Sequence, residues 1–345
     1  MADINSFFTA EDPFDITPTL KVEVPSTALE EVLIPVVSVV TTEVVPVAEK
    51  KKSKTVSYSQ YAMWLKCPQQ WKLSYIDYLA PYEGSLNTAF GTGIHHALQV
   101  FLQTLYTEGA AAADALPHFD LFKGAFDEAL KEVKNPLPDD IAAFENDAKV
   151  ILGHVLAPAV RAKHFPSKAY EVVGVELALE IPIRGGAITY KGYLDIVLKE
   201  KSTGKILILD FKTSTFGWNK YQKVDRTKVD QLLLYKRFYN QKFGTPMNQI
   251  EVEFFVLKRK LYEDVAFPQQ RIQRIKPADG KMSMKAVETS FLEFITECFD
   301  PHGVPNKDAH FIKNPDKGKK NCKYCTFATL INPATGEKYC DQKEG

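Results

Sequence analysis

Two apolar, β-rich runs joined by a short polar segment constrain the fold of this chain more than any other feature. The first run, Ile196-Val-Leu198, directly follows Asp195, and the second spans residues 205–212 and ends abruptly in Asp210-Phe-Lys212. Between them lies Ser202-Thr-Gly204, whose residue types are typical of turns. We therefore predict a hairpin of two buried strands, which would bring the two aspartates together.

The two aspartates and the lysine have complementary charges. Adjacent carboxylates repel each other unless a cation lies between them, and a hard ion such as Mg²⁺ prefers carboxylate and carbonyl oxygens. Lys212 lies two residues after Asp210, so both side chains point to the same face of a strand. An ammonium group there can orient a metal-bound water and offset negative charge on a phosphate. The set is therefore a candidate for a metal-dependent catalytic site.

An Asp-x-Lys triplet by itself gives weak support, because the chain repeats it at residues 147–149, 279–281 and 341–343. None of these repeats ends an apolar strand pattern. A surface ion pair at the end of a strand is the alternative interpretation of Asp210 and Lys212. The motifs that surround the triplet decide between the two interpretations.

Three motifs follow each other along this part of the chain. They are Gly-x-x-Asp, a strand that ends in Asp-x-Lys, and Gln-x-x-x-Tyr, and their last residues are Asp195, Lys212 and Tyr235. Together they resemble the RecB-like branch of the PD-(D/E)xK nuclease superfamily. The resemblance implies an α/β fold with a restriction-endonuclease-like core, in which helices flank a mixed β-sheet. It also implies Mg²⁺-dependent hydrolysis of phosphodiester bonds in DNA.

Gln231 and Tyr235 are four residues apart, so they fall on one face of the helix predicted over residues 228–243. In the family this pair lies beside the active site and touches DNA or the ligands of the metal. Without Asp-x-Lys upstream, a polar residue and a core tyrosine on an ordinary helix would be the better interpretation. The resemblance therefore implies five catalytic residues, namely Asp195, Asp210, Lys212, Gln231 and Tyr235.

A histidine on a predicted amphipathic helix completes the implied site. A helical histidine is more often structural than a metal ligand, but Gly91-Thr-x-x-His95 matches the family segment whose histidine helps to hold the catalytic metal. His96 lies about 100° further round the helix and is not assigned to the ion. The implied ligands of Mg²⁺ or Mn²⁺ are three side chains and one main-chain carbonyl, those of His95, Asp195, Asp210 and Phe211.

Five cysteines, an odd number, in a chain without an export signal indicate thiolate chemistry rather than disulfides. One lies in a Cys-Pro segment, as in AddB-like and CRISPR-adaptation nucleases, and three lie near the C-terminus. This one-plus-three arrangement resembles the way those nucleases hold a [4Fe–4S] cluster, and the implied ligands are Cys67, Cys322, Cys325 and Cys340. Four thiolates also suit tetrahedral Zn²⁺, and a site without metal is a third alternative.

The cysteine spacing departs from the family pattern in one respect. The interval between Cys325 and Cys340 is longer than the short one usual before the last ligand. Cys298 belongs neither to the Cys-Pro segment nor to the C-terminal group of three cysteines, and it is predicted to be a core thiol. The implied cluster would clasp the helical N- and C-terminal segments of the fold to each other.

The chain is predicted to divide into four parts. Residues 1–55 are rich in proline, valine, threonine and acids and are predicted to be a disordered acidic tail, either a docking peptide or a plain linker. A helical segment with Cys67 and His95 follows over 56–168, and it opens with a helix near Ser57. The nuclease core spans 169–260, and a C-terminal helical segment with the cysteine cluster spans 261–345.

The formal net charge of zero is unevenly distributed. Residues 1–49 carry nine acidic side chains and one lysine, so this part has a charge of −8 and the remainder +8. A basic body attracts a phosphate backbone, although solvated protein faces carry similar charges. No apolar run approaches the roughly 20 residues of a membrane span, and the N-terminus lacks the order of a secretory signal. We therefore expect no membrane association and a cytoplasmic location, in the host cytoplasm if a phage encodes the chain.

The resemblance implies an exonuclease that acts on DNA ends in recombination or repair. Its implied partners are single- or double-stranded DNA ends and a single-strand-annealing protein or a helicase. The alternatives are an endonuclease of restriction or CRISPR-adaptation type and a catalytically silent DNA-binding or scaffolding protein with the same fold.

Overall fold

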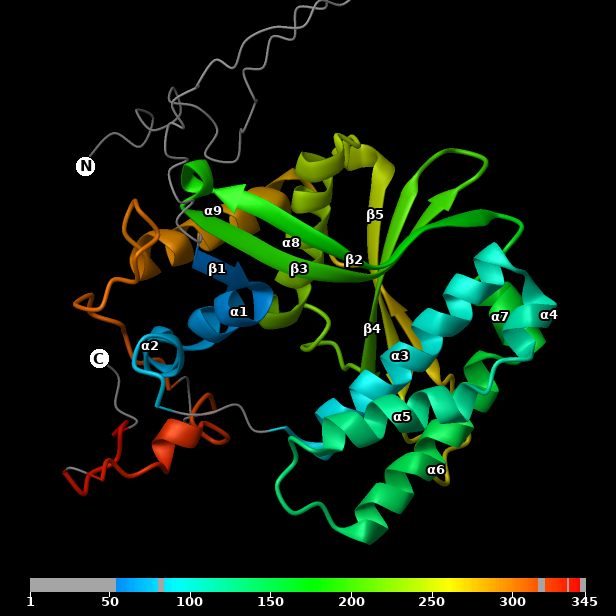
Figure 1. The fold of residues 1–345 in the computed structure, drawn as a ribbon, viewed down its shortest axis with the longest axis horizontal. Coiled ribbons are helices and arrows are strands. Elements are labelled where there is room, and N and C mark those ends of the chain that lie inside the picture. The colour runs from blue at the N-terminus through cyan, green and yellow to red at the C-terminus, as the bar shows by residue number, and fades with distance from the viewer. Residues whose placement is uncertain (1–53, 80–83, 316–319, 334, 342–345) are drawn as a thin grey trace, which may run out of the picture.

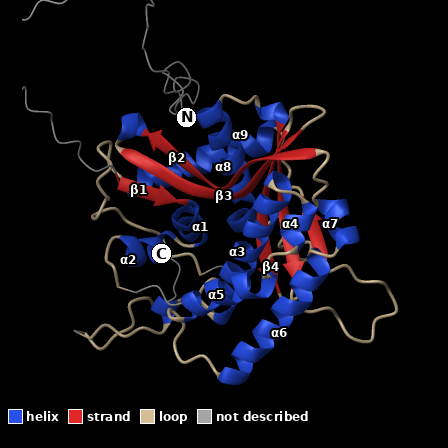
Figure 2. Cartoon of the chain, turned by 45° about the vertical axis from the view of Figure 1, so that its right-hand side comes forward, coloured by secondary structure: helices blue, strands red, loops and turns tan. Residues whose placement is uncertain are grey.

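The computed structural model describes residues 54–79, 84–315, 320–333 and 335–341. All but the last two residues of the predicted tail, 1–55, lie outside the described residues. In the described ranges the chain forms a mixed sheet with helices on both faces (Figure 1), and the same layers are seen from another side (Figure 2). The predicted α/β architecture is confirmed. Within those ranges, no helix has the length and apolar character needed to cross a lipid bilayer.

Six strands form the sheet, in the order β1-β3-β4-β5-β6 with β2 paired to β3 outside this path. The strands are β1 (Lys54–Ser57), β2 (Tyr170–Ile183), β3 (Ile188–Glu200), β4 (Ile206–Ser214), β5 (Ile250–Lys258) and β6 (Ile272–Ile275). β1 is parallel to β3, and β4 is parallel to β5. The pairs β2–β3, β3–β4 and β5–β6 are antiparallel, so the sheet is mixed as predicted.

Strand β3 changes its partner halfway along one edge. Its residues 188–191 pair with β1, and its residues 196–199 pair with β4, whereas β2 pairs along the other edge. Residues 192–195, the predicted Gly-x-x-Asp motif, therefore lie where the sheet divides between β1 and β4. The predicted hairpin is confirmed, because Ile196 pairs with Leu209 in the antiparallel β3–β4 ladder.

Nine α-helices cover the described parts of the sheet. They are α1 (Tyr58–Lys66), α2 (Pro68–Tyr75), α3 (Leu86–Thr107), α4 (Ala110–Asp114), α5 (His118–Leu130), α6 (Pro138–Val155), α7 (Pro158–His164), α8 (Arg226–Phe243) and α9 (Lys281–Cys298). Helices α1, α2, α8 and α9 share one hydrophobic core with the sheet, and α3 to α6 share a second. On β4, Ile206 and Ile208 enter the first core, while Leu207, Leu209 and Phe211 enter the second. The apolar run is continuous because both faces of the strand are buried.

The two predicted helix starts lie within two residues of the observed ones. Ser57 is the N-cap of α1, and its hydroxyl accepts a hydrogen bond from the Gln60 amide at 3.5 Å. Asp225 caps α8 by accepting from the Thr227 amide at 3.0 Å. Helix α8 begins two residues before the predicted position, and it carries Gln231 in its first half and Tyr235 near its middle.

The C-terminal part combines sheet, helix and irregular chain. Within residues 261–345, β6 extends the sheet and α9 is the single described α-helix. In the described residues after Cys298 the regular element is a single 3₁₀ turn, η5 (Thr326–Ala328). Two further 3₁₀ turns, η2 (Arg184–Gly186) and η3 (Met247–Gln249), lie in the loops before β3 and β5.

Candidate active site

Asp195 lies at the division of the sheet and joins β3 to β4 through its side chain. The last main-chain pair of the β3–β4 ladder is Ile196 with Leu209. Beyond it, the Phe211 amide donates a hydrogen bond to Asp195 Oδ2 at 2.7 Å. The carboxylate thus takes the place of a main-chain acceptor, and this fixes its position next to Asp210.

Asp210 and Lys212 lie on β4 and point to the same side, as their spacing predicts. Lys212 Nζ is 2.6 Å from Asp210 Oδ2, and the Asp210 side chain is 3% exposed. Despite this ion pair, Asp210 Oδ2 makes no hydrogen bond of suitable geometry with the described residues. A buried carboxylate oxygen without a hydrogen bond is an energetically costly arrangement, which a cation would relieve.

The two carboxylates have different proton affinities. Burial raises the pKa of Asp210 to about 6; Lys212 opposes this shift and Asp195 adds to it. Burial would also raise the pKa of Asp195, but His95, Lys212 and the Phe211 amide outweigh it, so that this pKa is lowered. Neighbouring charges therefore keep Asp195 ionised and leave Asp210 as the carboxyl group more easily protonated.

His95 reaches the carboxylates from α3, which packs against the second core. Its Nδ1 is 3.6 Å from Asp195 Oδ1, and its ring meets Phe211 edge-on at 6.0 Å. The glycines of the Gly-Thr-Gly segment let this helix approach its neighbours. A Cβ at Gly93 would lie 2.7 Å from the Phe122 ring of α5, so the close packing of α3 requires glycine at this position.

Gln231 and Tyr235 approach the site from α8. Gln231 Nε2 donates a hydrogen bond to the Tyr235 hydroxyl at 2.9 Å. Burial raises the pKa of Tyr235, and the neighbouring Asp210 and Asp195 raise it further. A Cβ at Gly192 would lie 3.1 Å from the Tyr235 ring, so this glycine gives the ring its place beside the carboxylates. The spacing of the motif alone did not indicate that contact.

His96 points to a different region from His95. It lines a groove between α3 and β2 together with Gln99 and Glu176, whereas His95 faces Asp195. Glu176 has a left-handed backbone (φ 48°), and its neighbours in β2 pair with the residues on either side of Asp195. Of the two histidines, His95 is therefore the one that lies next to Asp195.

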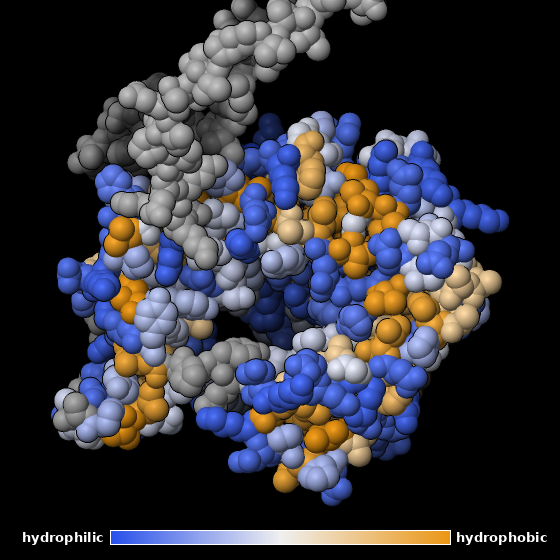
Figure 3. All heavy atoms as spheres, viewed as in Figure 1, coloured by the Kyte–Doolittle hydropathy of each residue, from blue (hydrophilic) through white to orange (hydrophobic). Residues whose placement is uncertain are grey.

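A hollow lies in the middle of the face shown in Figure 3, and its visible walls are mainly hydrophilic. It separates the part of the molecule that carries α1 and α2 from the part that carries α3 and α5, as a comparison with Figure 1 shows.

Comparison with known families shows the superfamily of this chain. The family model described as the PD-(D/E)XK nuclease superfamily matches residues 55–330, which is more than half of the chain. The chain belongs to the PD-(D/E)XK nuclease superfamily. A search of curated proteins found no match.

Two solved structures have partial similarity to this superfamily member. One is a protein from Eubacterium rectale described as a "putative exonuclease", with 13% identity, a TM-score of 0.43, and coverage of 70% of this chain and 79% of that chain. The other, SSO0001, has 14% identity, a TM-score of 0.33, and coverage of 83% of this chain and 90% of that chain.

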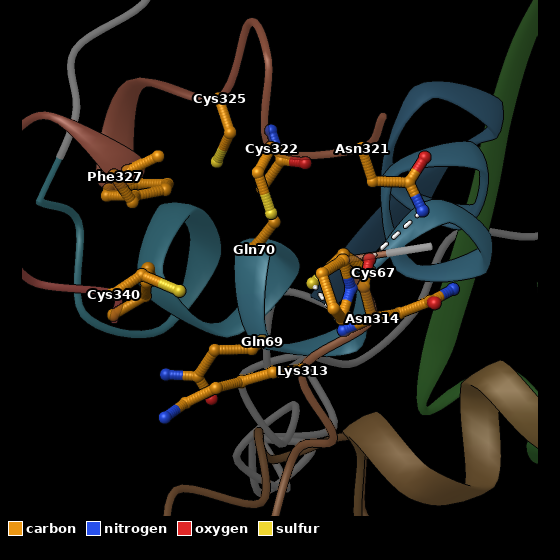
Figure 4. A pocket seen from close by; sticks show the side chains of 13 residues that line it. Cys67, Gln69, Gln70, Lys313, Asn314, Asn321, Cys322, Cys325, Phe327 and Cys340 are labelled. Atoms are coloured by element: carbon orange, nitrogen blue, oxygen red, sulfur yellow. Dashed lines mark hydrogen bonds between the residues drawn. The ribbon is translucent and has the colours of Figure 1, made fainter. Parts of the chain in front are cut away.

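The four cysteines outside the core of this PD-(D/E)XK protein line one pocket. They are Cys67, Cys322, Cys325 and Cys340 (Figure 4), and all four are free of disulfide bonds. Burial raises the pKa of Cys325, and the nearby Cys340 and Cys67 add to this effect. Cys298 is fully buried in the first core, as predicted for a core thiol.

Hydrogen bonds hold the C-terminal segment against the turn between α1 and α2. The Asn314 amide N–H donates to Cys67 Sγ at 3.4 Å, and the side-chain amides of Asn314 and Asn321 both donate to the Lys66 carbonyl. In the described residues, however, no group of three or more histidines, cysteines or acids has the arrangement of a metal site. The shared pocket is thus the observation that brings these cysteines together.

Proposed function

We propose that this protein is a metal-dependent deoxyribonuclease that acts as an exonuclease on DNA ends in recombination or repair. One observation carries the proposal. Asp195, Asp210, Lys212 and His95 converge from β3, β4 and α3 at the division of the sheet, in a chain that belongs to a nuclease superfamily.

The residue types at this site are those that bind a divalent cation, although the described side chains are not arranged around one as they stand. Asp210 Oδ2 is a buried acceptor without a suitable hydrogen bond among the described residues, and Asp195 is next to it. The proposed ligands of Mg²⁺ or Mn²⁺ are His95, Asp195, Asp210 and the Phe211 carbonyl. When bound, such an ion acts as a Lewis acid on phosphate and lowers the pKa of water.

Lys212 has the central role among the residues of the chain itself. Its ammonium lies on the same strand face as Asp210, and its side chain is 30% exposed, so it can contact both a buried carboxylate and a substrate. We assign it the positioning of the attacking water and the balancing of charge on the phosphate. Gln231 and Tyr235, fixed to each other by their hydrogen bond, are assigned to contacts with DNA beside the site.

Digestion of end-labelled linear DNA tests the proposal. Wild-type protein should release nucleotides from linear DNA with Mg²⁺ and none with a chelator, and it should spare covalently closed circles. Lys212→Ala and Asp210→Ala should each lower the rate by about 100-fold or more, because each removes a group that acts on the transition state. Lys281→Ala serves as a matched control, because this exposed lysine belongs to a chance Asp-x-Lys at the start of α9.

Three results would contradict parts of this proposal. Full activity of Lys212→Ala and Asp210→Ala would refute the site. Cleavage of closed circles would indicate an endonuclease. Metal-dependent DNA binding without cleavage by the wild-type protein would indicate a silent scaffold.

We also propose that Cys67, Cys322, Cys325 and Cys340 hold a [4Fe–4S] cluster. Four thiols from the two ends of the described chain line one pocket, and thiolates are the ligands of iron–sulfur clusters. Anaerobically purified protein should be brown and contain iron and sulfide, and Cys322→Ser should lose both. A colourless protein with one equivalent of zinc would refute the cluster in favour of a structural zinc site.

A further inference from the structure

Two loops continue from the active-site strand and its neighbour and are bonded to each other. One follows β4 after Ser214, and the other follows β5 after Lys258. The Arg259 amide donates to the Ser214 carbonyl at 2.8 Å, and the Lys260 amide donates to the Thr215 carbonyl at 2.7 Å. These bonds extend the β4–β5 pairing beyond the sheet, so the loops have a defined position relative to Lys212.

A second set of hydrogen bonds fixes each loop internally or to the sheet. Gln273 of β6 brackets Trp218, accepting from its amide at 2.9 Å and donating to its carbonyl at 3.0 Å. Across the other loop, Gln269 accepts from the Tyr262 amide and donates to the Tyr262 carbonyl, at 2.8 and 2.6 Å. These hydrogen bonds fix the conformation of both loops, so the loops can present side chains in a defined arrangement.

The side chains that these loops present to solvent include a stacked aromatic pair. The rings of Phe216 and Tyr262 have centroids 4.7 Å apart and planes inclined by 12°. Phe216 is 43% exposed and Tyr262 56% exposed, whereas many large aromatic residues of the fold are buried in the two cores. Tyr221 and Phe267 of the same loops are also exposed, at 71% and 61%. Exposed aromatic surface of this kind marks a binding site.

The same loops carry basic residues that are available to a partner. Residues 214–228 contain four basic side chains and one acidic, and residues 258–271 contain four basic and two acidic. Among the described residues, Lys220, Lys223 and Lys258 have no carboxylate within ion-pairing distance. The Lys220 ammonium lies 5.0 Å from the Tyr221 ring. Aromatic rings interleaved with free ammonium groups are the combination that binds single-stranded nucleic acid.

The Phe216–Tyr262 pair lies close along the chain to the candidate active site. Phe216 follows Lys212 by four residues, so their Cα atoms are at most about 14 Å apart. One DNA strand could therefore contact both Lys212 and Phe216. Base faces are free to stack on Phe216 and Tyr262 only when they are not covered by neighbouring base pairs, and this condition holds in a single strand or an unpaired end.

We propose that the Phe216–Tyr262 pair and the surrounding lysines form a platform that binds single-stranded DNA next to the active site. This inference rests on the proposed nuclease function and adds the substrate class: a DNA end with unpaired bases. The aromatic pair stacks on the bases, and Lys220, Lys223 and Lys258 contact the phosphates.

The test measures binding apart from cleavage. Fluorescence anisotropy with labelled oligo(dT) and with a blunt duplex, both in a chelator, is recorded for Lys212→Ala protein with and without Phe216→Ala and Tyr262→Ala. The two ring deletions should together weaken oligo(dT) binding by about tenfold or more and leave duplex binding nearly unchanged. Tyr262→Phe, which keeps the ring, should bind as the parent does.

Phe243→Ala is the matched control, because Phe243 is 44% exposed and its ring also contacts a tyrosine ring, that of Tyr239, in a tilted arrangement, but it lies at the far end of α8. Tyr262→Leu keeps apolar bulk without a ring and covers the case in which the alanine variants fold poorly. Unchanged oligo(dT) affinity in the folded ring variants would overturn the platform, and so would an equal loss for the duplex. Neither result bears on the nuclease assignment, which fails only if wild-type protein with Mg²⁺ does not cleave DNA.

Discussion

Lys212 and Asp210 lie on one strand face but differ in exposure. The carboxylate is buried and the ammonium is partly exposed, so the pair connects the protein interior to the space where a substrate would lie. The i and i+2 spacing made their common direction predictable from the sequence. The hydrogen bond from the Phe211 amide to Asp195 was not predictable, because it depends on where the β3–β4 ladder ends.

Gly192 provides a prediction at this scale. Alanine at this position would place its Cβ 3.0 Å from Tyr190 and 3.1 Å from Tyr235, so one of the rings must move. We expect Gly192→Ala to lower the free energy of unfolding by about 1–3 kcal/mol and the cleavage rate by about 10- to 100-fold. Urea denaturation and the end-labelled digestion measure the two effects.

Gly153→Ala is the control for that variant. Gly153 lies within α6, and an added Cβ there meets no atom within 4 Å. This change should leave cleavage unaltered and stabilise the protein by up to about 1 kcal/mol, as alanine does in a helix. Equal behaviour of the two variants would contradict a special role for Gly192.

Elements far apart in sequence make contacts that local sequence patterns do not predict. The β3–β4 hairpin and the helix after Ser57 were predictable, because each depends on residues close together in the chain. The parallel pairing of β1 with β3 was not, since Lys54–Ser57 is short and begins in a basic run rather than in an apolar pattern. Yet this pairing creates the division of the sheet at Asp195.

Helix α1 provides a prediction at the scale of elements, because one buried hydrogen bond joins it to α8. The Tyr61 hydroxyl, on a side chain with no exposed surface, donates to Asp230 Oδ2 at 2.9 Å. Tyr61→Phe should lower the free energy of unfolding by about 1–3 kcal/mol, because Asp230 loses a buried donor and, of its side-chain donors in the described ranges, retains Arg226. Tyr106→Phe is the control, since the buried Tyr106 hydroxyl has no partner among the described residues and its loss should cost little.

The whole molecule brings the two ends of its described chain together at the cysteine pocket. The α1–α2 turn and the C-terminal segment are joined there by the donations of Asn314 and Asn321 to the Lys66 carbonyl, whatever the pocket binds. The resemblance of one early and three late cysteines to AddB-like nucleases predicted that residues more than two hundred positions apart would meet. Sequence spacing does not determine which metal these cysteines would hold, because that depends on the geometry of the ligands.

Charge at the scale of the whole chain gives the last prediction. Residues 1–49 contribute −8 to a formal net charge of zero, so a chain that lacks them has a charge of +8. Deletion of residues 1–49 should tighten DNA binding at low ionic strength and steepen its decline with added salt, because the acidic segment no longer competes with phosphate. Anisotropy titrations of both chains in a chelator, from about 0.01 M to 0.3 M salt, measure this difference, which should shrink as the Debye length falls below about 10 Å.

A full-length variant with the nine acids changed to amides separates charge from docking: it should match the deletion if repulsion is the cause. Weaker binding by the deletion but not by the amide variant would instead show that the segment contacts DNA directly.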